Sequence, residues 1–283
     1  MNIRMIPRLD IKGPNLVKGI HLEGLRVLGK PEEFARYYSK LGADELLYMD
    51  IVASLYERNS ILDMVKSTSS QIFIPLTVGG GLRSLNDIRD ALHAGADKVA
   101  LNTAVIRRPE LIKEAAEQFG SSTIVISLEA KKQPDGSYEA YIDCGRERTR
   151  LEAVSWAQKT AELGAGEIMV TSIDQEGTGM GYDCELTKII SKSVTIPVVA
   201  CGGAGKVDHV RQVIHEGQVN AVSIASMLHY DLVKQFPKVG SNASKTLTSG
   251  FSRIKPASVQ QIKKHLIDND IECRWIKEEK IYE

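Results

Sequence analysis

Several acidic and polar side chains directly follow short apolar segments of this 283-residue chain. Asp10 ends the segment that begins at Arg4, and Glu129 follows the apolar residues 123–128. Two carboxylates that meet at one edge of a sheet can act as general base and general acid once their pKa values differ. A strand-end carboxylate can instead cap a helix or pair with a lysine, and the sequence leaves both roles open. Other candidates for contacting a substrate follow later strands: Asp50, Asn102, Ser172 and, in the loop 174–179, Glu176 and Gly177.

A glycine-ended apolar segment occurs twice. Residues 74–81 read IPLTVGGG and residues 196–203 read IPVVACGG, and Gly80 and Gly202 are 122 residues apart. Gly95 and Gly217 keep the same separation of 122 residues. Each segment has the length of a buried parallel strand that leads into a glycine-rich turn. The repeat indicates that one half of the chain is a diverged copy of the other.

The repeated turns predict two phosphate sites, because backbone N–H groups in such turns bind phosphate without a formal positive charge. Small residues after the next strand of each half complete the two sets: Gly80, Gly81 and Thr103 in the first half, and Gly202, Gly203, Ala225 and Ser226 in the second. A single glycine turn can serve only a tight bend. Two turns at equivalent places favour a substrate with a phosphate at each end.

Eight strand-length segments alternate with helical patterns. The strands are expected at residues 4–10, 45–51, 74–81, 98–101, 123–128, 167–172, 196–203 and 221–224. A parallel connection needs a covering helix, such as the one that begins at Pro31. The pattern predicts an α/β fold, a single (β/α)8 TIM barrel over residues 1–283 built from two repeated half-barrels. Catalysis in this fold takes place at the carboxyl ends of the strands, where the acids and glycine turns would meet.

Some segments fall outside the alternation. Residues 12–29 are expected to form a long loop that carries Lys18, and QPDG at 133–136 predicts the turn of a small hairpin that runs to Tyr141. The period then predicts a helix over residues 151–163. Residues 237–250 are polar and rich in Ser, Thr and Gly, which indicates a mobile loop insertion. Residues 251–283 are expected to carry a final helix over about 256–268 and a tail.

The composition excludes some classes of partner. Lys and Arg together number 36, as do Asp and Glu, so no overall field recruits nucleic acid or an anionic membrane. The four cysteines form no C-x-x-C pair, and no signal or membrane-spanning segment is visible. We therefore expect a cytoplasmic protein with free thiols, no metal site and no cofactor. Cys201 is interpreted as a small buried hydrophobe.

Several motifs resemble the cyclase subunit of imidazole glycerol phosphate synthase along nearly the whole chain except residues 237–250. They are IPRLD at 6–10, LVKG at 16–19, GADEL at 42–46, TVGGG at 77–81, GADKV at 95–99, GAGEI at 164–168, GTGMGYD at 177–183 and GGAG at 202–205. The GYD at 181–183 favours the cyclase over the related sugar-phosphate isomerase of the same pathway.

The resemblance implies an ammonia-dependent lyase reaction in histidine biosynthesis. Ammonia from a glutaminase subunit, the partner in a heterodimer, condenses with a bis-phosphorylated ribulosyl-formimino aminoimidazole carboxamide ribonucleotide. Ring closure and cleavage give imidazole glycerol phosphate and aminoimidazole carboxamide ribotide. The family's catalytic aspartate matches Asp10, its first-loop lysine matches Lys18, and its substrate contacts match Asp50 and Asn102. The family's ammonia gate matches four charged residues that could equally form a structural ion-pair ring: Arg4, Glu45, Lys98 and Glu167.

Four residues depart from the pattern that the resemblance implies. Glu129 and Glu176 stand where aspartates are usual, Cys201 stands where a serine is usual, and Arg8 places a long cation beside the end of the first strand. An added methylene moves a carboxylate by about 1.5 Å, and a misplacement of about 1 Å can lower a rate about 10²-fold.

Two other functions therefore stay open. One is a paralogue that delivers ammonia for the acetamidino modification of a surface sugar. Relatives of that kind tend to lose the strand-one aspartate, whereas Asp10 is present here. The other is a non-catalytic barrel that binds a phosphorylated ligand or a partner subunit, and the presence of both Asp10 and Lys18 counts against it.

Overall fold

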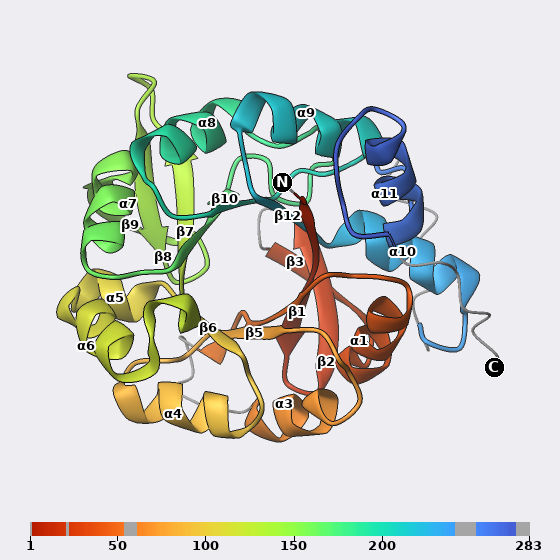
Figure 1. Cartoon of the computed structure of the whole chain (residues 1–283), viewed down its shortest axis with the longest axis horizontal. Helices are drawn as coiled ribbons and strands as arrows, with labels where there is room; N and C mark the ends of the chain where they lie inside the picture. The colour runs from red at the N-terminus through yellow and green to blue at the C-terminus, as the bar shows by residue number, and fades with distance from the viewer. Residues whose placement is uncertain (1, 21–22, 54–60, 241–252, 276–283) are drawn as a thin grey trace.

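The fold is built around a closed barrel of eight parallel strands in the described part of the chain (Figure 1). The computed structural model describes residues 2–20, 23–53, 61–240 and 253–275. Around the barrel, the strands are β1 (Arg4–Lys12), β4 (Leu46–Asp50), β5 (Leu76–Gly79), β6 (Lys98–Leu101), β7 (Ile124–Lys132), β10 (Glu167–Ser172), β11 (Val198–Cys201) and β12 (Ala221–Ile224). Because β12 pairs in parallel with β1, the sheet closes without an edge. The predicted (β/α)8 barrel is confirmed.

Helices form a ring outside the barrel (Figure 1). In the described residues they are α1 (Pro31–Lys40), α3 (Leu62–Ser69), α4 (Leu85–His93), α5 (Thr103–Arg107), α6 (Glu110–Phe119), α7 (Ala153–Glu162), α8 (Cys184–Ser193), α9 (Val207–Gly217), α10 (Ser226–Gln235) and α11 (Val259–Ile267). Pro31 occupies the first turn of α1, where its missing N–H leaves no bond unmade. The same helix buries Phe34 and Tyr38 against the barrel, so one apolar face holds it in place.

Two antiparallel hairpins extend the first and fifth barrel strands. β2 (Asn15–Ile20) and β3 (Glu23–Gly29) follow β1, while β8 (Tyr138–Ile142) and β9 (Glu147–Glu152) follow β7. The predicted long loop over residues 12–29 is therefore wrong. β1 continues past the barrel to Lys12, and its free edge there pairs with the returning chain, as in the pair Asp10↔Val17.

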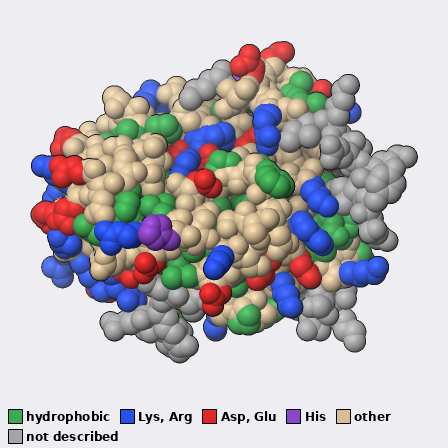
Figure 2. Space-filling view, turned by 60° about the horizontal axis from the view of Figure 1, so that its bottom comes forward, with side chains coloured by type: hydrophobic (Ala, Val, Ile, Leu, Met, Phe, Trp, Pro, Cys, Tyr) green, Lys and Arg blue, Asp and Glu red, His purple; other side chains and the backbone are tan. Residues whose placement is uncertain are grey.

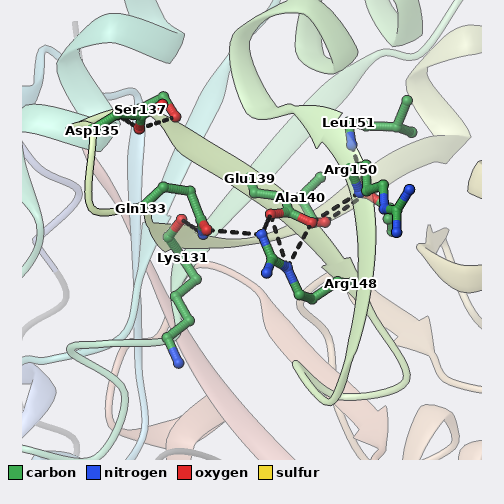
Figure 3. Close-up of polar contacts among 10 residues, drawn as sticks. Lys131, Gln133, Asp135, Ser137, Glu139, Ala140, Arg148, Arg150 and Leu151 are labelled. Carbon is green, nitrogen blue, oxygen red and sulfur yellow. Dashed lines mark hydrogen bonds and ion pairs between the residues drawn. The ribbon is translucent and has the colours of Figure 1, made fainter.

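A polar cluster holds the second hairpin together (Figure 3). Glu139 on β8 is only 6% exposed, and Arg148 Nη2 on β9 donates to it at 2.6 Å. The backbone N–H of Arg150 donates to the same carboxylate at 2.9 Å. Glu152 ends β9 and caps the next helix by accepting from two of its backbone N–H groups. This cap explains why α7 begins at Ala153 rather than at the predicted residue 151.

An apolar layer fills the barrel interior between its two charged ends. Its members come from alternate positions of the strands and form one buried cluster that includes Ile6, Leu47, Val125, Met169, Val199 and Ala221. Inward-facing side chains of this size make the barrel a packed core rather than an open pore.

The backbone repeats between the two halves of the chain. The turn glycines all have positive φ: 97° at Gly80, 73° at Gly81, 89° at Gly202 and 101° at Gly203. The residues before α5 and α10 also match, with φ −135° and ψ −89° at Asn102 and φ −118° and ψ −87° at Ala225. The two halves therefore have the same backbone shape at the mouth of the barrel, the end at which the carboxyl ends of the eight strands lie.

Glycine is required at these turns by space as well as by conformation. A Cβ added to Gly80 would lie 2.1 Å from the carbonyl oxygen of Asp50, and one added to Gly203 would lie 2.0 Å from that of Gly181. Both distances are far shorter than any real contact of a Cβ atom. Each turn is thus fixed by close backbone approach.

The C-terminal part follows the sequence prediction where it is described. The final helix, α11, spans Val259–Ile267 and starts at a capping box between Ser258 and Gln261. Of the predicted insertion 237–250, residues 237–240 form a turn and the remainder lies outside the described residues.

A buried lysine fixes α11 to the amino-terminal end of the barrel. Lys263 is 2% exposed, and its Nζ donates to the carboxylate of Asp44 and to the carbonyls of Gly42 and Arg274, each at 2.8 Å. All three N–H bonds of the ammonium group are therefore satisfied.

We expect Lys263→Met to lower the free energy of unfolding by about 3 kcal/mol, because it leaves Asp44 and two carbonyls without their shared donor. Urea unfolding measures the loss. The adjacent, exposed Lys264 provides the control, and Lys264→Met should change stability by less than about 0.5 kcal/mol. Equal effects of the two substitutions would contradict the anchoring role.

Candidate active site at the carboxyl ends of the barrel strands

Asp10 lies at the mouth end of β1 in a buried network of charges. Its Oδ1 accepts from Arg8 Nε at 2.7 Å, and its Oδ2 accepts from Lys18 Nζ at 3.3 Å. Lys18, on β2, also donates to Glu176 in the loop after β10. All four side chains are at most 4% exposed. Burial alone would raise the pKa of Asp10, but the cations of Arg8 and Lys18 outweigh it and lower that pKa below its usual value.

Glu129 lies at the mouth end of β7 among different partners. Asn102 Nδ2 donates to its Oε2 at 3.2 Å, and the backbone N–H of Gly145, in the turn between β8 and β9, donates as well. Burial raises the pKa of Glu129 to about 7, and the more distant Arg8 only partly opposes this. The mouth therefore combines an ionised carboxylate with one that carries a proton near neutral pH.

The larger mouth pocket lies beside Glu129 and has a volume of about 270 Å³. The residues predicted for the first half of the site line it together: Asp50, Gly80, Gly81, Asn102 and Thr103. Its floor reaches Ala100 and Ser127 on the barrel wall, and three cations stand around it: Arg83, Arg107 and Arg108. Asp50 also accepts from the backbone N–H groups of Val52 and Ala53, so this carboxylate caps the turn after β4 as well.

The second mouth pocket is much smaller, about 20 Å³, and lies over β11 and β12. The residues predicted for the second half line it: Lys18, Glu176, Gly177, Gly202, Gly203, Ala225 and Ser226, together with Arg8. Ser223 in its wall is 2% exposed, and its hydroxyl has no hydrogen-bond partner within the described segments. A buried hydroxyl without a partner beside a glycine turn fits a site that a polar ligand completes.

Ser172 is the predicted site residue that the structure does not bring to the mouth. It lines neither pocket, and its hydroxyl donates at 3.3 Å to Asp183, the N-cap residue of α8. Its side chain thus serves the packing between strand and helix.

A ring of four charges occupies the other end of the barrel. Arg4 Nη1 donates to Glu45 at 2.5 Å, and Arg4 also pairs with Glu167. Lys98 Nζ lies 3.1 Å from Glu45 Oε2 and 3.3 Å from Glu167 Oε2. Each cation therefore bridges both carboxylates, and the predicted quartet forms a closed ring.

Nothing in the sequence indicated the hydrogen bond that holds the backbone carbonyl of Arg8 in place. His229 on α10 is fully buried and contacts the carbonyl oxygen of Arg8 through Nε2 at 2.9 Å and the phenol of Tyr38 through Nδ1 at 2.6 Å. Burial lowers the pKa of His229 to about 3, so the imidazole is neutral. Because a carbonyl can only accept, Nε2–H donates to Arg8 and Nδ1 accepts from Tyr38. No local sequence motif indicates this contact, because it joins residues that are far apart in the chain.

The inner wall below the mouth is also polar, which the strand-end rule did not predict. Arg8 Nη1 lies 3.5 Å from Thr171 Oγ1 and 3.3 Å from Cys201 Sγ. Thr171, Ser127 and Ser223 stand at inward positions of otherwise apolar strands. A polar residue two positions from an inward strand-end group is the signal that could have found them.

Acidic and basic side chains are interspersed on the face of the molecule that Figure 2 shows. No helix in the described ranges is long and apolar enough to cross a membrane. Within the same ranges, no group of three or more His, Cys, Asp or Glu side chains is placed to hold a metal ion.

The fold and the site together define a (β/α)8 barrel with two buried carboxylates at its mouth. The family model described as "Histidine biosynthesis protein" matches residues 4–234, and the chain belongs to this family.

Similar curated proteins are each named imidazole glycerol phosphate synthase subunit HisF. The one from Legionella pneumophila is 56% identical over 207 residues, which are 73% of this chain and 98% of the relative. The one from Alkaliphilus metalliredigens (strain QYMF) is 49% identical over 230 residues, or 81% and 91% of the two chains. The one from Bacillus cereus (strain G9842) is 42% identical over 271 residues, or 96% and 98%. Each name describes a subunit, and hence a component of a larger assembly.

We expect the unsubstituted protein to lose stability as pH rises through the pKa of Glu129, and Glu129→Gln to remove this loss. The variant should therefore gain stability relative to the unsubstituted protein as pH rises. A group whose pKa is raised on folding, here from 4.5 to about 7, stabilises the fold fully below its unfolded pKa and loses that contribution as pH rises through its folded pKa. Between pH 5 and pH 9, this contribution of Glu129 to the free energy of unfolding falls by up to about 3 kcal/mol. Urea unfolding across this range measures it.

The control is Glu117→Gln, which changes an exposed glutamate on α6 and should leave the pH dependence of stability as in the unsubstituted protein. Parallel pH curves for Glu129→Gln and the unsubstituted protein would show that Glu129 is ionised at little cost, and the acid assignment would be wrong.

Proposed function

We propose that the chain is the cyclase subunit of an imidazole glycerol phosphate synthase. It uses ammonia to convert the bis-phosphorylated ribulosyl-formimino aminoimidazole carboxamide ribonucleotide into imidazole glycerol phosphate and aminoimidazole carboxamide ribotide. The names of its relatives support this reaction. The observation that carries the proposal is the position of Asp10 and Glu129, two carboxylates of opposite protonation between two glycine-lined pockets.

The two pockets fit a substrate with an anion at each end. Gly80, Gly81 and Thr103 hold one phosphate in the larger pocket, where Arg107 adds positive charge. Gly202, Gly203 and Ser226 hold the other, with Ala225 and Ser223 beside them. In the first site Thr103 Oγ1 donates to the carboxylate of Asp143 at 3.3 Å. When the substrate binds, its phosphate replaces this carboxylate as the acceptor of the Thr103 hydroxyl. Lys18 and Glu176 border the second site and contact the substrate between its two ends.

The acid–base pair supplies the proton transfers that ring formation requires. Condensation of ammonia with a carbonyl group releases water, so the departing oxygen needs a proton, and Glu129 carries one near neutral pH. Closure of the imidazole requires removal of a proton from nitrogen, for which Asp10 is the ionised acceptor. The amine that leaves must gain a proton as its bond to carbon breaks, and the protonated Asp10 returns it. Asn102 orients Glu129 through its hydrogen bond.

Ammonia enters from the opposite end, where a glutaminase subunit docks. The ring of Arg4, Glu45, Lys98 and Glu167 closes the barrel at this end, so a break in it would admit a small neutral molecule. On the same end, Phe73 is 96% exposed and borders a groove of about 520 Å³ that includes Ile74 and Pro75. A large exposed aromatic side chain beside a groove is typical of a protein interface.

The sugar-amidinating alternative is not favoured, because the relatives found at 42–56% identity carry the name of the histidine-pathway subunit. Two of the departures that raised this alternative, Arg8 and Glu129, each have hydrogen-bond partners at the mouth: Arg8 donates to Asp10, and Glu129 accepts from Asn102.

The direct test offers the bis-phosphorylated precursor to the purified chain with ammonium salt and follows the appearance of imidazole glycerol phosphate. Glu129→Gln should lower kcat by about 10²–10⁴, the usual size of a general acid–base contribution, while Glu129→Asp should keep a measurable rate. Asp10→Asn should cause a loss of the same order, accompanied by lower stability because it removes the carboxylate partner of Arg8.

Asp135→Asn is the control, since Asp135 is exposed at the tip of the β7–β8 hairpin and should not affect the rate. Failure of the unsubstituted, folded protein to form product with ammonia in excess would refute the proposed reaction.

A second experiment separates ammonia passage from docking. Lys98→Met should lower glutamine-dependent turnover at least about tenfold more than ammonium-dependent turnover, because it opens the ring and disturbs transfer but not the mouth. Phe73→Ala should raise the dissociation constant of the glutaminase complex, and excess glutaminase should restore its activity.

The control for both variants is Lys113→Met, which changes an exposed lysine on the outer helix α6. If Lys98→Met lowered both activities equally, the ring would have only a structural role.

A further inference from the structure

Arg8 is the buried charge that the proposed reaction does not yet use. It is 2% exposed, it comes from the middle of β1, and its side chain crosses the barrel interior to Thr171 on β10 and Cys201 on β11. Its strongest contact is the 2.7 Å bond from Nε to Asp10. A buried guanidinium is costly unless its partners compensate it, so this contact constrains both groups.

The half-barrel repeat gives Arg8 a counterpart. Arg8 stands two residues before Asp10 on the first barrel strand, and Ser127 stands two residues before Glu129 on the fifth. Both side chains face the barrel interior, and each lines the pocket of its own side. The two carboxylates thus have equivalent places in the scaffold, but only Asp10 has a cation on the strand position below it.

The ion pairs inside the mouth are unevenly distributed. The two most deeply buried cations there, Arg8 and Lys18, contact two carboxylates, Asp10 and Glu176, and leave Glu129 out. Asp10 contacts both cations and Glu176 contacts Lys18, whereas Glu129 contacts only the neutral donors of Asn102 and Gly145. A buried carboxylate without a cation partner takes up a proton most readily.

Three arginines line the pocket of Glu129 but bond to other groups: Arg83 to the carbonyl of Ala53, Arg107 to Asp143 and Glu147, and Arg108 to Glu114. Asp50 is a further carboxylate in the same pocket.

The remaining titratable groups near the pair are Cys201 on β11 beside Arg8, Cys144 in the β8–β9 turn near Glu129, and the neutral His229 on α10 behind Arg8. Burial raises the pKa of Cys144 to about 12, so this thiol is neutral as well. Among the described residues, the direct hydrogen bonds given to Glu129 thus come from the neutral donors of Asn102 and Gly145.

We propose that Arg8 is a positioning residue that gives two equivalent carboxylates different roles: it holds Asp10 ionised as the proton acceptor and leaves Glu129 to hold the proton. The assignment of acceptor and donor rests on the proposed function. The protonation states themselves do not, and they can be measured without turnover.

The experiment is a ¹³C NMR titration between pH 4.5 and 9 of protein labelled at the side-chain carboxyl carbons of Asp and Glu. Spectra of Asp10→Asn and Glu129→Gln assign the two signals. In the unsubstituted protein, Asp10 should show no midpoint in this range and Glu129 a midpoint near pH 7. Arg8→Gln should move the Asp10 midpoint up by roughly 1–3 pH units and also raise that of Glu129.

Arg8→Lys keeps the charge and should leave Asp10 without a midpoint in the range. Lys263→Met is the matched control, because it removes a buried cation from the other end of the barrel. It should lower stability without moving either carboxyl signal. Turnover with ammonium salt provides a second readout, and the acid limb of the kcat profile should move to higher pH in Arg8→Gln but not in Arg8→Lys.

An Asp10 midpoint that is the same in Arg8→Gln and the unsubstituted protein would overturn the inference. If Arg8→Gln does not fold, the unsubstituted protein decides the matter, since an Asp10 that titrates above pH 5 would equally overturn it. If the carboxyl signals behave as expected but no variant forms product, the proposed reaction fails while the role of Arg8 in charge placement stands.

Discussion

The structure depends most on the burial of a charge network inside the barrel mouth. Arg8, Asp10, Lys18 and Glu176 are almost inaccessible to water, and removing such ions from water costs several kcal/mol each unless they compensate one another. They come from β1, β2 and the loop after β10, so these elements must be in place before the charges can pair. The closed β2–β3 hairpin is a consequence, because only a chain that folds back along β1 brings Lys18 to Asp10.

The glycine turns provide a second constraint, and here the origin is steric. Their positive φ values and close carbonyl contacts permit no side chain. The same turn appears in both halves, yet the pockets measure about 270 and 20 Å³. Arg8, Lys18 and Glu176 fill the second one. The backbone repeat thus sets where the anion sites lie, and the side chains of the buried network make them unequal.

The barrel was predictable because its strands are short apolar segments with clear ends. Strands expected at 98–101, 167–172 and 221–224 have those bounds in the structure. The hairpin over residues 12–29 was not predicted, since its glycines interrupt the alternation and its pairing depends on the extension of β1 beyond the barrel. The length of α7 differed for a local reason, the cap formed by Glu152.

The two-residue period of a strand decides in part which strand-end residues enter the site. Arg4 and Asp10 are separated by an even number of positions, as are Lys98 and Asn102, so both members of each pair face inward. Glu167 and Ser172 are separated by an odd number, and Ser172 accordingly lies against α8. Counting from the charged ring would have excluded Ser172, but it would also have excluded Asp50, which lies five positions after Glu45 and nevertheless lines the larger pocket. The same count does not reveal contacts such as that between His229 and Arg8, which depend on the tertiary arrangement.

The two ends of the barrel show how the pairing of charges can separate a closed ring from a reactive site. At the amino-terminal end two cations face two carboxylates, each cation bridges both acids, and no proton is needed for balance. At the mouth Arg8 and Lys18 pair with Asp10 and Glu176, whereas Glu129 is buried without a contacting cation, and burial raises its pKa to about 7. The first arrangement is complete without a ligand and suits a barrier. The second keeps a proton on a buried group whose pKa lies near neutral pH, which is what general acid catalysis requires.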